Sequence, residues 1–144
     1  MQVFRWIALA MAVVLIISCF YPWVSIEPGN IVISGFHSDI SDYGKPGILH
    51  AFITALCILF LLFNRAWSIR TAFFVSVFNI AWAFRNFMIL AACRGGICPV
   101  KHIAVYMVLL SSIAFSILIA IIKPKQQTEL KEDMETGERI KRYY

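Results

Sequence analysis

The chain has 144 residues, of which 60% are hydrophobic and 15% aromatic, and its mean hydropathy is +0.78. Only 15% of the residues are charged, whereas soluble domains carry about 25%, so the composition excludes a water-soluble globular domain and predicts an integral membrane protein. The formal net charge of +5 is explained by membrane orientation and by attraction to anionic headgroups, and it is no argument for nucleic-acid binding.

Four long apolar segments predict a bundle of four transmembrane helices over residues 3–24, 48–63, 72–92 and 103–122. About 20 apolar residues cross the hydrocarbon core, so the short second helix is expected to borrow Gly47 and the residues through Trp67. The segments must be helical because lipid satisfies no backbone hydrogen bond. The first begins like a signal peptide, but bulky aromatics replace the cleavage pattern in "CFYPWVS", so we expect it to be retained.

The predicted outer loop, residues 25–47, carries a small β-hairpin between the first two helices. Residues 23–27 and 31–34 alternate apolar and polar side chains around Pro28-Gly29-Asn30, which is a strong turn signal. Pro46 is expected near the first turn of the second helix, where a missing N–H costs little. A second outer loop is predicted over residues 93–101, and "NRAWSIR" is predicted as a tight basic turn on the other side.

Lysine and arginine residues near the helix ends predict the orientation. One side is flanked by Arg5, Arg65, Arg70, Lys123 and Lys125. On the other side the acids Glu27, Asp39 and Asp42 cancel Lys45, Arg94 and Lys101. Because the positive side faces the cytoplasm, the sequence predicts a multi-pass protein of the bacterial inner membrane with both termini cytoplasmic. Residues 1–122 would form the transmembrane domain, and 123–144 a charged tail that is either a short surface helix or disordered.

This arrangement of a hairpin-bearing first outer loop, a short second outer loop and two inner termini resembles the claudin-type tetraspan plan. The claudin pattern W-x-G-L-W…C…C is missing, because the first outer loop has Trp23 but no cysteine. The opening "PWVSI…ISG", from Pro22 to Gly35, is similar to uncharacterised small four-helix bacterial membrane proteins. That likeness covers about the first third of the chain and implies no activity.

Small and polar residues predict how the helices pack, since helices in lipid associate through close contacts of small residues and interhelical hydrogen bonds. The third helix carries Ser76, Asn79 and Asn86 in one stripe, and the fourth carries Ser112 and Ser116. One interpretation is a compact bundle held together by these residues. The other makes Asn79 and Asn86 part of a substrate path.

Arg85 is a charge inside the third apolar segment, roughly 10 Å from its outer end at 1.5 Å per residue. A charge at that depth is costly unless it reaches the headgroups or finds a partner. The alternatives are snorkelling, pairing with Glu27, Asp39 or Asp42, and binding an anionic headgroup, a substrate or a partner subunit. No acid lies in any predicted helix, so a proton relay within the membrane lacks its usual carboxylate.

Cys93 and Cys98 lie on the predicted outer side, which permits disulfides in a bacterial envelope. Gly95 and Gly96 allow the intervening residues to turn back, so a structural disulfide is predicted, with a redox-active pair or two free thiols as alternatives. The lone cysteines, Cys19 and Cys57, are interpreted as small hydrophobic residues.

His37, His50 and His102 also lie at the predicted outer surface, beside Asp39 and Asp42. Imidazole and carboxylate groups ligate zinc or copper. No two of these ligands are spaced three or four residues apart on a helix, so a site would depend on tertiary convergence, and no metal is assigned.

The sequence contains no glycine-rich phosphate loop, no G-x-S-x-G and no H-E-x-x-H motif, so we assign neither catalytic residues nor a cofactor. The first hypothesis is a non-enzymatic accessory or scaffold subunit of a larger inner-membrane complex, with lipid and other membrane subunits as partners. The second is an oligomeric transporter or channel lined by Asn79, Arg85 and Asn86. The third is a redox or quinone-linked protein resembling the DoxX type, using Cys93, Cys98 and the outer histidines.

Overall fold

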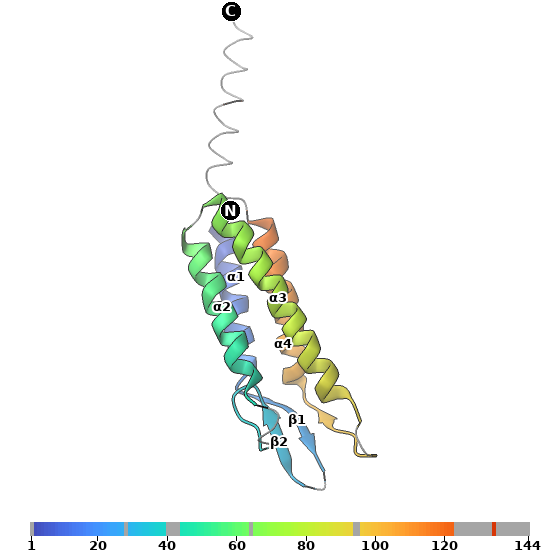
Figure 1. Cartoon of the computed structure of the whole chain (residues 1–144). Coiled ribbons are helices and arrows are strands. Elements are labelled where there is room, and N and C mark those ends of the chain that lie inside the picture. Colours follow the sequence, from blue (N-terminus) through green and yellow to red (C-terminus); the bar gives the residue numbers. More distant parts are fainter. Residues whose placement is uncertain are drawn as a thin grey trace, which may run out of the picture.

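The computed structural model describes residues 2–27, 29–39, 44–63, 65–93, 96–122 and 134. Within these ranges the elements follow in the order α1 (Gln2–Ser18), β1 (Pro22–Ile26), β2 (Ile31–Ser34), α2 (Pro46–Phe63), α3 (Ala66–Ala91), β3 (Val100–Lys101) and α4 (Ile103–Ile121). The helices run side by side, and the strands gather at the end of the bundle away from the N-terminus (Figure 1), which we call the sheet end. The predicted tail, residues 123–144, lies outside the described residues except for Met134.

The helices have the length and surface of membrane spans. α2, α3 and α4 are each long and apolar enough to cross a membrane, and α1 is a shorter apolar helix. Large apolar side chains cover the outside of the bundle, among them Phe74 at 72% exposure and Ile103 at 79%. A soluble bundle has the reverse distribution. The fold is therefore that of a multi-pass membrane protein, as the composition predicts.

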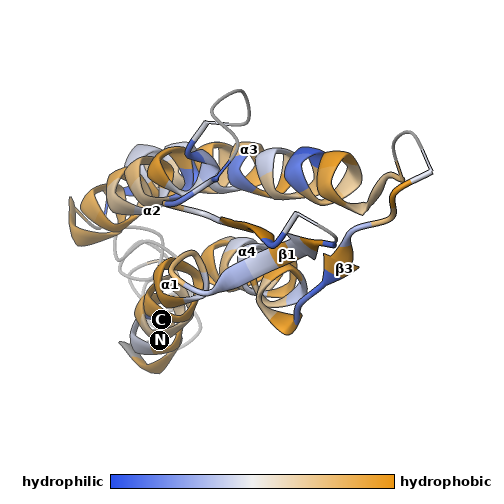
Figure 2. Cartoon of the chain, turned by 90° about the horizontal axis from the view of Figure 1, so that it is seen from below, coloured by the Kyte–Doolittle hydropathy of each residue, from blue (hydrophilic) through white to orange (hydrophobic). Residues whose placement is uncertain are grey.

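The four helices form two antiparallel pairs. α1 packs chiefly on α4 and α2 on α3, and α3 also contacts α4. Figure 2, seen along the bundle from the sheet end, shows the α2–α3 pair beside the α1–α4 pair. Ala8, Ala12 and Ala72 are fully buried in the core. Their short side chains allow close helix approach, which is how helices associate in lipid.

Three predicted helix bounds are wrong. α1 ends at Ser18 and not near Val24, because the chain turns at once and residues 22–26 form a strand. α2 ends at Phe63 instead of reaching Trp67, and α3 begins at Ala66, so most of "NRAWSIR" is helical. Hydropathy identifies which segments can lie at membrane depth, but β-branched residues such as those in "PWVSI" adopt a strand where a partner strand is available.

The predicted hairpin is present and gains a third strand. The antiparallel sheet has the order β2-β1-β3, with Val24 paired to Ile33 on one side and to Lys101 on the other. β3 comes from the second loop, between α3 and α4, and was not predicted because two residues carry no alternation. At the edge of β2, the Val32 N–H donates to Asp39 Oδ2 at 2.8 Å. The chain's own residues thus occupy positions that an incoming strand would otherwise use.

Candidate functional site beneath the sheet

The contacts between α2 and α3 define a register that runs the length of both helices. The interhelical hydrogen bonds include Ser68 Oγ to Phe60 O at 2.5 Å, Cys57 Sγ to Ala72 O at 3.5 Å and Trp82 Nε1 to Pro46 O at 3.2 Å. Trp82 therefore lies beside the first residue of α2, at the sheet end. This register sets the level of each polar residue of α3 relative to α2.

His50 and Asn79 join the two helices about one helical turn further from the sheet end than Pro46 and Trp82. Both side chains are 0% exposed, and His50 Nδ1 lies 2.6 Å from Asn79 Oδ1. Because an amide oxygen only accepts hydrogen bonds, Nδ1–H is the donor. Asn79 Nδ2 donates in turn to Thr54 Oγ1 at 3.4 Å. We call these three side chains the His50 network.

The other ring nitrogen of His50, Nε2, is buried and has no hydrogen-bond partner in the described part of the chain. The rings of Trp23 and His50 form a T-shaped contact, with their centroids 6.2 Å apart. The prediction that His50 lies at the outer surface is therefore wrong, because the sheet folds back over the start of α2. A buried acceptor without a donor is destabilising, so His50 is held by its surroundings as well as by its own hydrogen bond.

Trp23 covers the His50 network on the side of the sheet. The β1–β2 register shifts between Pro22 and Val24, and such a bulge re-aims side chains. As a result the consecutive residues Trp23 and Val24 are both buried, at 1% and 0% exposure. Trp23 Nε1 donates to Ser18 O at the end of α1, 3.0 Å away. Trp23 thus fastens the sheet to α1 while covering α2.

Two glycines bring three segments into backbone contact beside Trp23. Gly35 N donates to Cys19 O at 2.9 Å, and Gly47 N donates to Gly35 O at 2.7 Å. A Cβ on Gly35 would lie 2.7 Å from Cys19 O, and one on Gly47 would lie 2.7 Å from Gly35 O. Neither position accommodates a side chain without movement of the backbone. The end of α1, the end of β2 and the start of α2 therefore form one rigid junction.

The remaining predicted packing residues lie inside the bundle. Ser76 Oγ donates to Phe73 O at 2.7 Å, so it accepts from Ser116 Oγ, 2.9 Å away, in the bond that joins α3 to α4. Ser112 Oγ donates within its own helix to Val108 O, at 2.7 Å. Asn86 is 2% exposed and its Nδ2 donates to Trp82 O at 2.8 Å. Most of these polar groups therefore form hydrogen bonds within a helix or between two helices.

Arg85 faces away from the bundle. Its side chain is exposed, and its guanidinium carbon lies 5.0 Å from the centre of the Trp82 ring, a cation–π contact. Since Trp82 is level with Pro46, Arg85 lies almost one turn, about 5 Å, beyond the start of α2. Among the described residues, the ion pair is between His37 and Asp39. The pairing of Arg85 with Glu27, Asp39 or Asp42 stays a prediction. Asp42 lies outside the described residues.

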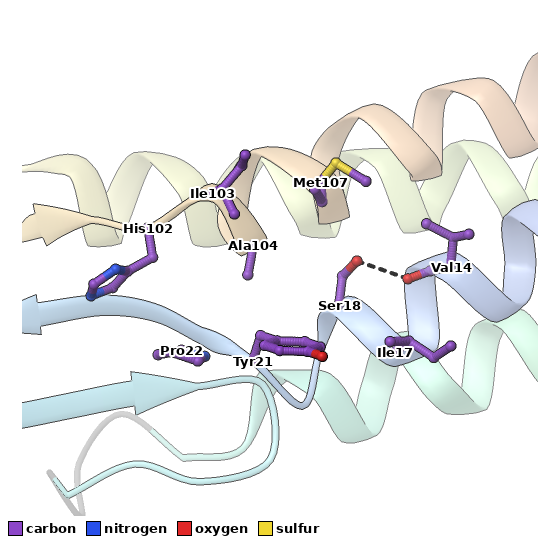
Figure 3. A pocket seen from close by; sticks show the side chains of 9 residues that line it. All are labelled: Val14, Ile17, Ser18, Tyr21, Pro22, His102, Ile103, Ala104 and Met107. Carbon is purple, nitrogen blue, oxygen red and sulfur yellow. Dashed lines mark hydrogen bonds between the residues drawn. The ribbon is translucent and has the colours of Figure 1, made fainter.

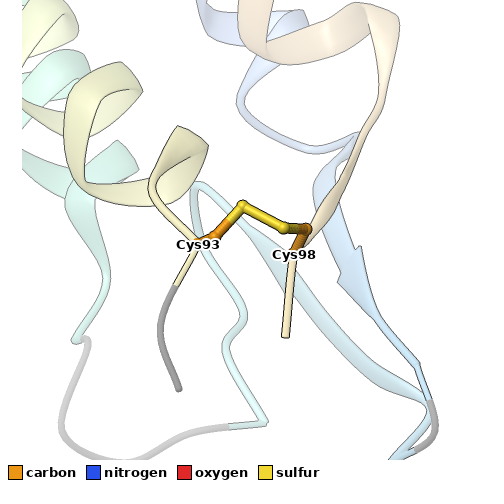
Figure 4. Close-up of a disulfide and its surroundings, with 2 residues drawn as sticks. All are labelled: Cys93 and Cys98. Carbon is orange, nitrogen blue, oxygen red and sulfur yellow. A yellow bond between two sulfur atoms is a disulfide. The ribbon is translucent and has the colours of Figure 1, made fainter. Parts of the chain in front are cut away.

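The predicted disulfide is present between Cys93 and Cys98, whose Cα atoms are 4.3 Å apart. Figure 4 shows that it links the chain after α3 to the chain that leads into β3. Both cysteines are exposed, whereas Cys19 and Cys57 are buried free thiols. The bridge thus holds the third strand close to the end of α3.

The three histidines lie in different surroundings. His37 Nε2 is 3.1 Å from Asp39 Oδ1 on the exposed side of the sheet, and His102 Nε2 is 3.1 Å from Ser25 Oγ. The Val32 N–H bond, followed by the His37 hydrogen bond, lowers the pKa of Asp39 below its ordinary value. Over the ranges that the structure describes, no three histidine, cysteine or acidic residues form a metal-binding group.

No family model, no curated protein and no solved structure matches this chain. We therefore infer function from the side chains and their surroundings.

Sequence reasoning missed the pairing of His50 with Asn79. The signal was available in part, because helices joined by a short connection are antiparallel neighbours and each residue interrupts an apolar run. The face on which His50 lies could not be obtained in this way, since it depends on how the sheet covers α2.

Proposed function

We propose that this protein is a non-enzymatic subunit of a larger membrane-protein assembly in the bacterial inner membrane, with both termini in the cytoplasm. The observation that carries the proposal is the outward-facing Arg85 on α3, with Trp82 beneath its guanidinium. Charged residues in membrane helices almost always face the interior of a bundle, where they find a partner. Arg85 instead faces outward, so its partner would come from a neighbouring subunit that packs against α3.

The surface around Arg85 suits a helix-to-helix contact. Phe78, Phe84 and Met88 are 62%, 55% and 55% exposed on the same part of α3. Interface centres are enriched in aromatic residues, methionine and arginine. A partner helix with a carboxylate near its end would pair with Arg85, because guanidinium binds carboxylate with two parallel hydrogen bonds. Asp39 is already engaged by Val32 and His37.

Charge supports the proposed orientation. Arg65 and Arg70 lie at the start of α3, and Arg5 donates to Leu61 O near the end of α2, so all three mark the end opposite the sheet. Lysine and arginine favour the cytoplasmic side. The sheet would then face the periplasm, where the Cys93–Cys98 disulfide is chemically stable.

The rigid junction beneath the sheet supports a scaffold role. Trp23 and the two glycines fix the sheet to α1 and α2, so its position follows the bundle. A rigid surface loses little conformational entropy when it binds a partner. The proposed subunit thus offers two fixed surfaces, the exposed face of α3 and the sheet.

The test is purification of the tagged protein from its native membrane in mild detergent, followed by identification of copurifying material. We expect stoichiometric foreign subunits with the native chain, and their loss in Arg85→Leu. Lys45→Leu is the matched control, because it removes one exposed positive charge at the same end of the bundle. A homo-oligomer alone would favour the transport hypothesis instead, and bound haem, metal or quinone would favour the redox hypothesis.

A further inference from the structure

The third strand is held to the sheet by few interactions of its own. β3 consists of Val100 and Lys101, both exposed, and it forms one edge of the sheet. Beside it, His102 N donates to Trp23 O at 2.8 Å. Hydrogen-bonded positions alternate along an antiparallel pair, so Ser25 and Val100 form the next bonded pair. Strands are usually about 5–6 residues long, so the position of β3 depends on how its two ends are attached.

The two ends of β3 are attached in different ways. On one side, His102 lies directly before α4 and beside β1 (Figure 3), and its Nε2 is 3.1 Å from Ser25 Oγ. On the other side, the Cys93–Cys98 bridge connects the strand to the end of α3 (Figure 4). Val100 is therefore held between α4, which is part of the bundle, and a covalent bond that a reductant can break.

The bridge shortens the connection between α3 and Val100. Along the chain, the eight residues 92–99 separate Ala91, the last residue of α3, from Val100. Through the disulfide, the path passes only residues 92, 93, 98 and 99. Doubling the length of a connecting segment lowers the probability of closing it about threefold. Reduction should therefore weaken the pairing of Val100 with Ser25 by about that factor.

The bridge is accessible to reagents, whereas the other thiols are not. Cys93 and Cys98 are both exposed, and Cys19 and Cys57 are buried in the bundle. Exposed disulfides are the labile and regulatory ones, because an attacking thiolate must reach one of the two sulfur atoms. Burial keeps the two free thiols of the chain away from the bridge, so an external thiol decides whether it is reduced.

We propose that the Cys93–Cys98 bridge is a redox-controlled restraint on β3, and that reduction by the dithiol of an oxidoreductase releases Val100 from β1. One thiolate of the dithiol attacks a sulfur of the bridge, the S–S bond breaks, and the other cysteine leaves as a thiolate that takes up a proton. The second thiol of the reductant, after losing its proton, attacks the reductant's own sulfur in the mixed disulfide and displaces the remaining cysteine. Cys93 and Cys98 together gain two electrons and two protons, and the dithiol becomes a disulfide.

Reduction would change one edge of the sheet and leave the attachment of the sheet to the bundle in place. Ser25 would lose the partner of its N–H and C=O groups, so β1 would become an edge strand at that position. Trp23 would keep its hydrogen bond to Ser18 O, 3.0 Å away, and β1 would keep its pairing with β2. This restraint is independent of the partner surface proposed around Arg85.

The test is amide hydrogen exchange of the full chain in detergent micelles, measured for each residue by nuclear magnetic resonance before and after treatment with dithiothreitol. Mass spectrometry after alkylation verifies the reduction. We expect the Ser25 amide to exchange about threefold faster in the reduced protein, since exchange reports local opening. The amides of Val24 and Ile26 face β2, because bonded positions alternate along β1. They are internal controls and should not change.

Two variants separate the bridge from other effects of the reductant. Cys93→Ser/Cys98→Ser should show the faster Ser25 exchange without dithiothreitol and should not respond to it. Cys57→Ser removes a thiol but keeps a hydrogen-bond donor at that position, and it should respond like the native chain. Unchanged Ser25 exchange in the reduced protein, equal acceleration at the two control amides, or a bridge that dithiothreitol does not reduce in the folded chain would overturn the proposal.

Discussion

Replacing Asn79 with leucine should destabilise the bundle, because it leaves the buried His50 side chain without its hydrogen-bond acceptor. In Asn79→Leu the His50 Nδ1–H, now bonded to Asn79 Oδ1 at 2.6 Å, remains 0% exposed and loses its acceptor. His50 Nε2 already lacks a partner among the described residues, so both ring nitrogens would then be unsatisfied. Loss of one buried partner costs about 1–3 kcal/mol.

The membrane environment narrows that range. Interhelical hydrogen bonds in lipid average about 0.6 kcal/mol and reach about 1.7 kcal/mol, because the unfolded helices also find partners. The short His50–Asn79 bond belongs near the upper value, so we expect Asn79→Leu to lower the free energy of unfolding by about 1–2 kcal/mol. The second contact of Asn79, to Thr54 Oγ1 at 3.4 Å, is long. Thr54→Val should therefore cost at most about 0.6 kcal/mol and serves as the matched control.

The decisive variant is the double substitution His50→Leu/Asn79→Leu. Replacing both partners with apolar groups leaves neither unsatisfied and also removes the unpartnered Nε2, so the double variant should lose less stability than Asn79→Leu alone. The assay is unfolding by sodium dodecyl sulfate in mixed micelles, followed by far-ultraviolet circular dichroism. Losses in the two single variants that simply add in the double variant would refute the reasoning, because additivity means no coupling between the side chains.

Three further predictions concern the junction, the disulfide and the orientation. Gly35→Ala should lower the free energy of unfolding by about 1–3 kcal/mol through overpacking, since the new Cβ would lie 2.7 Å from Cys19 O. The same unfolding assay tests this. Cys93 and Cys98 should resist a thiol-labelling reagent until a reductant is added, and replacing both with serine should cost about 2 kcal/mol, because the bridge closes a short loop; rapid labelling without reductant would contradict it. A reporter fused after Tyr144 should be active only if it functions in the cytoplasm, and periplasmic activity there would reverse the proposed orientation.

The sequence by itself determined the class of the protein and its principal elements. Hydropathy is a property of each segment alone, so four apolar runs were enough to predict four helices, and Pro28-Gly29-Asn30 between alternating residues was enough to predict the hairpin. The disulfide was also predictable, because Cys93 and Cys98 are close in the chain and flank two glycines. In each case the interaction is local in sequence.

Only the tertiary structure decided which side chains are covered. Tryptophan is a residue type expected at a membrane interface, yet a bulge in β1 turns Trp23 onto α2, where it covers His50. The third strand arises because the loop after α3 returns to pair with β1. Arg85 faces outward, and its level is set by the register of α3 against α2. These features depend on contacts between segments far apart in the chain, which the periodicity of any one segment does not contain.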